Sequence, residues 1–277
     1  MDEFLRTLDD GRVFVDYGPA SMVITARREG EPLSDLACAA FPLIRDSLAE
    51  IAGELDTLRQ FPCRGDYSRL TGLPLVMAEA VLATGEPTLT PMAAVAGTMA
   101  DIVADWIFAR GADLVAVNNG GDVALRLGPG QSIRMGILPD LNGGVTEIVT
   151  IRAEDGIGGV CTSGLGGRSL TRGVASAVTV FSARCALADA CATHIANTSF
   201  VDSPRVHACR AGELEPGSDI AELTVVRAVD PLTEEEIALS LAQVRAEAER
   251  QRRRGNLRMA AADVQGRRIW IPEDAQV

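Results

Sequence analysis

The feature that most constrains the fold is a β-hairpin signal near the middle of the chain. Residues 113–117 and 123–127 are two short apolar runs, and Asn118-Asn-Gly-Gly-Asp122 separates them. The two adjacent glycines can supply the positive φ angles that a tight hairpin turn requires. The segment therefore predicts a pair of neighbouring antiparallel strands around which the other elements must be arranged.

Strands and helices are expected to alternate along the rest of the chain. Ser34 should cap the first long helix, Pro42 should kink or break it, and Thr233-Glu-Glu-Glu236 resembles the capping box of the last one. Because hairpins are mixed with helices, we expect an α+β fold with mixed or antiparallel sheets and packed helices. The expected strands are 12–15, 22–26, 132–138, 147–152, 175–181, 223–227 and 268–271, and the expected helices are 34–55, 73–83, 91–109, 183–196 and 233–254.

Composition limits the classes of partner. The 277 residues carry a formal net charge of −12, and only 4% of them are aromatic. Such a chain is poorly suited to nucleic acid or to an anionic membrane surface. The N-terminus lacks a signal-peptide pattern, no window has eighteen uncharged apolar residues, and the six cysteines form no C-x-x-C pair. We therefore expect a cytoplasmic protein with reduced thiols.

A glycine-rich run over residues 159–169 has the composition of an anion-binding loop. Gly159-Val-Cys-Thr-Ser-Gly164 and Gly166-Gly-Arg-Ser169 combine backbone amides, hydroxyls and the Arg168 guanidinium, which suits a phosphate or a carboxylate. The run is neither a Walker A loop nor a nucleophile elbow. Cys161 is interpreted as a small packed residue, because only Arg168 could activate it.

Asp189 and Thr193 lie four residues apart in a helix otherwise made of Ala, Leu and Cys. A carboxylate in such a helix needs a partner. Two interpretations have equal weight: a Mg²⁺ or Ca²⁺ site completed by ligand oxygens, and a capping or salt-bridged aspartate beside a threonine bonded to its own helix. Asp122 either meets a ligand or closes an ordinary hairpin turn, which is the commoner case. His194 is interpreted as a packing or surface residue.

These motifs together resemble the ApbE-like superfamily of flavin transferases, and more closely its uncharacterised cytoplasmic branch. The resemblance covers about residues 10–200. It implies an α+β fold, FAD in a cleft, and a divalent metal, usually Mg²⁺, that bridges the pyrophosphate. Members hydrolyse FAD or transfer FMN to a threonine of a partner protein. The matching segments, in order, are Thr90-Pro-Met-Ala-Ala-Val-Ala-Gly97, Asn118-Asn-Gly-Gly-Asp122, Gly159-Val-Cys-Thr-Ser-Gly164, Gly167-Arg-Ser-Leu170, and Leu187-Ala-Asp-Ala-Cys-Ala-Thr193 with Asn197.

The resemblance also implies roles for individual residues. Asp189 and Thr193 would bind the metal, with a backbone carbonyl near Ala94 or Val95 completing its shell. The nucleotide pocket would be lined by Asn119, Gly120, Gly121, Asp122, Thr162, Ser163 and Gly164, to which the glycine-rich run adds Arg168.

Two departures from the transferases bear on activity. The transferases carry a Lys-Gly pair where this chain has Ala96-Gly97. They also carry a His-containing segment that ends in Asp-Pro-x-Thr-Gly, where this chain has only residues 168–173. No catalytic residue is assigned, and three functions stay open: a metal-dependent enzyme acting on a flavin nucleotide, a non-catalytic binding module, and an assembly protein with a decayed site. We expect one domain over 1–277, a divergent part at 201–277 that covers the site or forms an interface, and a homodimer.

Overall fold

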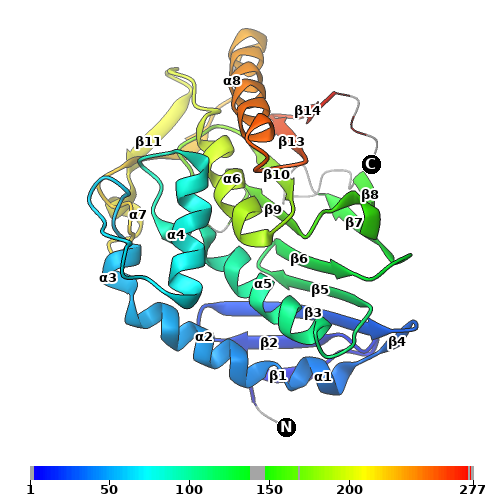
Figure 1. Ribbon diagram of the computed structural model, residues 1–277. Coiled ribbons are helices and arrows are strands. Elements are labelled where there is room, and N and C mark those ends of the chain that lie inside the picture. The colour runs from blue at the N-terminus through cyan, green and yellow to red at the C-terminus, as the bar shows by residue number, and fades with distance from the viewer. Residues whose placement is uncertain (1–2, 138–146, 168, 274, 276–277) are drawn as a thin grey trace.

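The computed structural model describes residues 3–137, 147–167, 169–273 and 275. Its centre is a ten-stranded sheet (Figure 1) in which every pairing between described strands is antiparallel. The α+β class is thereby confirmed, with antiparallel rather than mixed sheets. The strand order is β1 (Leu5–Thr7), β2 (Val13–Tyr17), β3 (Ala20–Arg28), β5 (Leu114–Asn119), β6 (Asp122–Leu127), β9 (Gly159–Ser163), β10 (Ala177–Ser182), β13 (Met259–Val264) and β14 (Arg267–Ile271), with β4 (Glu31–Pro32) paired to β3.

Helices cover one face of this sheet, and two of them lie over its centre (Figure 1). The helices α5 and α6 pack against each other; α5 also contacts β5 and β6, and α6 contacts β9 and β10. The helices are α1 (Ser34–Cys38), α2 (Phe41–Gly53), α3 (Leu55–Leu58), α4 (Gly72–Thr84), α5 (Val95–Phe108), α6 (Cys185–Asn197), α7 (Ala211–Leu214) and α8 (Glu234–Arg253), with short 3₁₀ turns at Pro91–Ala94 and Ala153–Asp155. A separate hairpin of β11 (Val206–Arg210) and β12 (Thr224–Val229) flanks α7.

Successive side chains of the central strands alternate between two apolar cores. On β9, for example, Cys161 joins the core under the helices, whereas Val160 joins a second core on the opposite face. The second core is closed by the hairpin of β7 (Ser132–Ile137) and β8 (Glu147–Arg152). Arg268 of β14 holds this hairpin down through an ion pair of 2.5 Å to Glu147. At its centre the sheet is therefore covered on both faces.

Most of the predicted elements are confirmed. The central hairpin forms with Asn119 opposite Asp122, and its two turn glycines, Gly120 and Gly121, have φ angles of 71° and 116°. The last helix begins after Thr233, whose side chain forms the predicted capping box with Glu236. Pro42 lies in the first turn of a new helix, so the break is also confirmed.

Other expectations were wrong. Residues 159–163 form strand β9 rather than part of a loop, because three of these five residues are valine, cysteine and threonine, which fit a pleated sheet. Ser34 does not cap a helix: its hydroxyl donates to the Gly11 carbonyl at 2.7 Å, and Leu33 occupies the N-cap position. Strands β11 and β13 were not predicted, and the alanine-rich sequence of β13 gives little strand signal.

The segment Pro91–Phe108 is long and apolar enough, by length and composition alone, to cross a membrane. About half of it, 56%, is buried inside the structure. Its apolar character is accounted for by packing, because α5 is covered by α6 and by the sheet.

Two glycines allow α5, β9 and α6 to meet at Cys185. A Cβ atom on Gly159 would lie 2.3 Å from the Cys185 Cα, and a Cβ atom on Gly97 would lie 2.4 Å from the Cys185 carbonyl oxygen. Both neighbours are backbone atoms, so no side-chain rotation could relieve the overlap. The centre of the helical layer is therefore set by these two contacts.

We expect Gly159→Ala to lower the free energy of unfolding by roughly 2–4 kcal/mol, because β9 and α6 must separate. Urea unfolding followed by circular dichroism measures the change. Gly53→Ala is the matched control, since a Cβ atom there meets nothing within 4 Å. Equal stability of the two variants would contradict the close packing at Cys185.

Candidate functional site

A cavity of about 1030 Å³ opens where the pairing of β6 and β9 ends. The ladder pairs Val123 with Val160 and Ala124 with Gly159, whereas β9 continues along β10 as far as Ser163. Beyond the last pair, the Asp122 carboxylate lies near the Thr162 N–H, which acts to lower the pKa of Asp122. The carboxylate thus lies at the end of the paired stretch, beside the cavity.

The cavity brings most of the predicted site residues together. Gly164 is not among its lining residues; it turns the chain at the end of β9 with a φ angle of 143°. Arg168 lies outside the described residues. The predicted residues that do line the cavity are Asn119, Gly120, Gly121, Asp122, Thr162, Ser163, Asp189 and Thr193.

Sequence reasoning missed three further parts of the lining. Strand β7 contributes Ile133–Ile137, β10 contributes Thr179, and the segment after α7 contributes Glu215 and Asp219. Nothing in the sequence of β7 distinguishes it from an ordinary strand. The two carboxylates in the short turn after α7 were a detectable signal. Part of the divergent region 201–277 therefore lines the site.

Asp189 reaches from α6 to the beginning of α5. Its Oδ2 accepts a hydrogen bond of 2.9 Å from the Gly97 N–H, so the capping role is observed. Burial, and then the charge of Asp122, raises the pKa of Asp189 well above its usual range. No arginine within the described ranges forms an ion pair with it. An ionised Asp189 therefore lacks a counter-charge.

Asp122 is the second carboxylate of the cavity. Burial raises its pKa to about 6, against the opposing effect of hydrogen bonds from the Cys161 thiol and the Thr162 N–H. No group of three or more His, Cys, Asp or Glu side chains able to hold a metal occurs in the described part of the chain. A cation at these carboxylates would therefore need oxygen atoms from ligand, backbone or water, which is the arrangement that Mg²⁺ favours.

Asn119 connects the hairpin turn to α5. Its side-chain amide donates to the Ala96 carbonyl at 3.2 Å, so the turn is held against the same helix end that Asp189 caps. The Gly120-Gly121 turn is thereby fixed at the cavity wall. Backbone amides and carboxylates from three elements thus meet in one place.

Two thiols lie directly behind this wall. The Sγ atoms of Cys161 and Cys185 are 3.4 Å apart and fully buried. Burial raises the pKa of both thiols, that of Cys185 to about 12. The prediction that Cys161 is a packed residue rather than a nucleophile is consistent with this.

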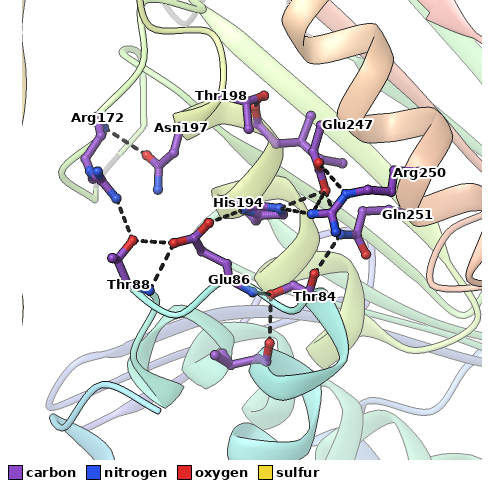
Figure 2. A network of polar contacts seen from close by, with 12 residues as sticks. Thr84, Glu86, Thr88, Arg172, His194, Asn197, Thr198, Glu247, Arg250 and Gln251 are labelled. Atoms are coloured by element: carbon purple, nitrogen blue, oxygen red, sulfur yellow. Dashed lines mark hydrogen bonds and ion pairs between the residues drawn. The ribbon is translucent and has the colours of Figure 1, made fainter. Parts of the chain in front are cut away.

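His194 belongs to a polar network between α6 and α8 (Figure 2). Its Nε2 lies 2.8 Å from the Glu247 carboxylate and its Nδ1 lies 3.6 Å from Glu86. Burial alone would raise the pKa of Glu247, but hydrogen bonds from His194, Arg250 and Gln251 outweigh it and lower that pKa to about 2. His194 is 3% exposed, so it is the packing residue of the two expected alternatives.

The network continues to the cavity wall. Glu86 bonds the Thr88 hydroxyl, and Arg172 donates to that hydroxyl at 2.7 Å. The Arg172 N–H also donates to the Asn197 side chain at 2.9 Å. Because Thr88 and Asn197 line the cavity, α8 supports the site from behind.

Several known proteins resemble this chain in sequence. The model of the family described as AbpE bacteria matches residues 5–269. The UPF0280 protein MK0206 of Methanopyrus kandleri is 38% identical over 57% of this chain and 64% of its own length. The UPF0280 protein of Methanococcoides burtonii is 34% identical, over 52% of this chain and 57% of its own length. The chain thus spans less than two thirds of these relatives.

Solved structures show a more distant likeness. Flavin Transferase ApbE from Vibrio cholerae is 15% identical, with a TM-score of 0.44 over 66% of this chain and 85% of that one. The Pseudomonas stutzeri flavinyl transferase ApbE, in its apo form, is 16% identical, with a TM-score of 0.43 over 73% and 88%. At these values the structural likeness supports no argument about function.

We expect Asp189→Asn to stabilise the metal-free protein at pH 7.5 by roughly 1–2 kcal/mol. The raised pKa of Asp189 means that its ionised form destabilises the fold once the pH exceeds 3.8, the ordinary value. The amide removes the charge and keeps an acceptor for the Gly97 N–H. Thermal unfolding after treatment with EDTA should show the gain at pH 7.5 and a smaller one at pH 4. A less stable variant at pH 7.5 would refute the uncompensated charge.

We expect Glu247→Gln to lower the free energy of unfolding at pH 7 by roughly 1–2 kcal/mol, allowing for solvent screening. The depressed pKa of Glu247 makes its contribution complete above pH 4.5 and lost as the pH falls towards 2. Urea unfolding at pH 7 and pH 3 should therefore separate wild type from variant mainly at pH 7. Glu249→Gln, whose ion pair to Arg252 is 3.3 Å long, is the control and should change stability little.

Proposed function

Because the chain belongs to the AbpE bacteria family, we propose that it binds FAD, or a related phosphorylated cofactor, with a divalent cation in the cavity. The observation that carries the proposal is the pair of carboxylates, Asp122 and Asp189, which line one cavity and form no ion pair with any described residue. Family membership confirms the resemblance drawn from the motifs. The assignments of the ligand and of the metal rest on the chemistry of the residues that line the cavity.

The donor set fits Mg²⁺, with Ca²⁺ as the alternative. Asp189 and Thr193 lie one helical turn apart on α6 and both line the cavity, so they would hold the ion through oxygen atoms. The Ala94 carbonyl, at the N-cap of α5, already accepts the first intrahelical bond and a hydrogen bond of 2.6 Å from the Thr98 hydroxyl. The bound ion would neutralise phosphate charge and polarise the bond that is broken.

Side chains and backbone groups of the protein itself orient and bind the ligand. The Gly97 N–H fixes one oxygen of Asp189, and Asn119 fixes the glycine turn against α5. The Gly121 N–H is already used by the Asn118 side chain at 2.9 Å. Asp122, with a pKa of about 6, is suited to take up a proton near neutral pH. We therefore favour hydrolysis or group transfer at phosphate, with Asp122 as the proton acceptor.

A second candidate is a module that binds the cofactor without turnover. Within the described residues the cavity lining contains no histidine and no lysine, and Ala96 occupies the position where the transferases carry lysine. A site with so few proton-transfer groups can hold a ligand and still be slow in chemistry. Product formation distinguishes the two candidates.

The test is a titration of FAD into the protein with and without Mg²⁺, followed by flavin fluorescence and by chromatography for FMN and AMP. We expect Mg²⁺-dependent binding that Asp189→Asn weakens at least about tenfold, since a metal ligand is lost. Asp46→Asn makes the same chemical change on an exposed residue of α2 and should bind as wild type does.

Each result decides between the candidates. FMN and AMP in the wild-type mixture, absent with Asp189→Asn, indicate an enzyme. Metal-dependent binding without products indicates the binding module. Failure of the wild-type protein to bind FAD would refute the flavin proposal, and equal binding by Asp189→Asn would refute the metal site.

A further inference from the structure

The outer face of α8 carries a regular row of solvent-facing residues along the whole helix. The inner face is buried through Ile237, Val244 and their neighbours, and Figure 1 shows the helix at the edge of the molecule. On the outer side, exposed or half-exposed residues recur at alternating spacings of four and three. This row, which we call the α8 seam, consists of Glu235, Leu239, Ala242, Ala246, Glu249 and Arg253. The spacing is that of a coiled-coil contact, which a second helix covers.

The middle of the α8 seam is small and apolar. Ala242 and Ala246 are both exposed, and their short side chains allow a second helix to approach to the lower end of the usual range of about 8–10 Å. Leu239 beside them is 53% exposed. Phe200 adds apolar surface on this side, because the carbonyl of the residue before it accepts a hydrogen bond of 2.8 Å from the Ser240 hydroxyl. Covering these side chains with another helix would stabilise the contact.

The two ends of the α8 seam carry opposite charges. Glu235 lies in the first turn and Arg253 in the last, and neither forms an ion pair with any residue that the structure describes. The other charged residues of α8 are all paired: Glu234 with Arg267, Glu236 with Arg205, Arg245 with Glu273, Glu247 with Arg250, and Glu249 with Arg252. Because eighteen residues make five complete turns, Glu235 and Arg253 point to the same side of the helix, about 27 Å apart.

A second copy of α8 fits this pattern in the antiparallel direction. With a twofold axis between Ala242 and Ala246, Ala242 of one copy faces Ala246 of the other. The same axis places Glu235 of each copy opposite Arg253 of the other. A parallel arrangement would instead place Glu235 opposite Glu235 and Arg253 opposite Arg253, and like charges repel. The charges therefore select the antiparallel pair.

The last pair of the α8 seam is Leu239 opposite Glu249. The Glu249 carboxylate is held by Arg252 at 3.3 Å, so its methylene groups are left to cover the leucine. Two helices alone bury less than the roughly 800 Å² per partner of a standard interface. We therefore expect an association that is weak and depends on protein concentration.

We propose that the α8 seam binds the α8 seam of a second copy of this chain, antiparallel, to form a homodimer. Val244 is nine residues from either end of the seam and lies on the opposite side of the helix, so its packing in the core is unaffected. Glu247 likewise keeps its contact of 2.8 Å with His194. The inference needs no ligand, and it can fail without affecting the proposed function.

The first measurement is sedimentation velocity of the full chain at concentrations from about 1 to 100 µM, in about 50 mM salt so that charge pairs are little screened. We expect the monomer to convert to a dimer within this range. Wild-type protein that stays monomeric at the highest concentration would overturn the inference and would leave the α8 seam as a solvated face or as a contact for another protein.

The second measurement reverses the charges at the ends of the α8 seam. In Glu235→Arg or Arg253→Glu alone, both symmetry-related charge pairs become repulsive, so the dissociation constant of the dimer should rise at least about tenfold. An equimolar mixture of the two variants should associate as wild type does, within about threefold, because every arginine then faces a glutamate of the other copy. Arg59→Glu and Glu154→Arg reverse exposed charges outside α8 and are the matched controls.

A third variant tests the close approach of the two helices. Ala242→Glu places a charge on an exposed position of the monomer but into the centre of the dimer, so the dissociation constant should again rise at least about tenfold. Circular dichroism checks that each variant keeps its helices, and recovery in the mixture shows the same for the charge reversals. Association unchanged in all three variants would overturn the inference, as would loss in the single variants without recovery in the mixture.

Discussion

The site depends on the contact of three backbones at Cys185. Gly97 on α5 and Gly159 on β9 each approach that residue so closely that no Cβ atom could be accommodated. This approach brings the beginning of α5 within 2.9 Å of the Asp189 carboxylate, one turn further along α6. Packing density in the helical layer and the position of a candidate metal ligand are therefore set by the same two glycines.

The buried charge at Asp189 costs the fold stability, which fits the metal-binding role proposed for this residue. A capping carboxylate at an exposed helix end stabilises the helix, but here burial and Asp122 raise its pKa well above the ordinary value. A neutral amide would serve the fold better at neutral pH. An acidic side chain in that place is understandable when a cation bound at the cavity supplies the missing charge.

Much of this fold could be predicted from local sequence, but the site only in part. The Asn119–Asp122 turn and the Thr233 cap are short-range patterns whose physics lies within a few residues. The gathering of Asp122, Asp189 and Thr193 was foreseen through motif resemblance. The contribution of β7 could not be, because its place in the cavity depends on long-range packing. Strand β9 was mistaken for a loop since its glycine serves helix contact rather than a turn.

The interruption of the sheet is what turns a packed centre into a cavity. A continued β6–β9 ladder would satisfy its own hydrogen bonds and keep the two faces apart. Here the ladder ends at Val123 and Val160, and the Asp122 carboxylate lies beside the open strand end and lines the cavity. The end of the ladder explains why threonines from one face and aspartates from the other line a single cavity.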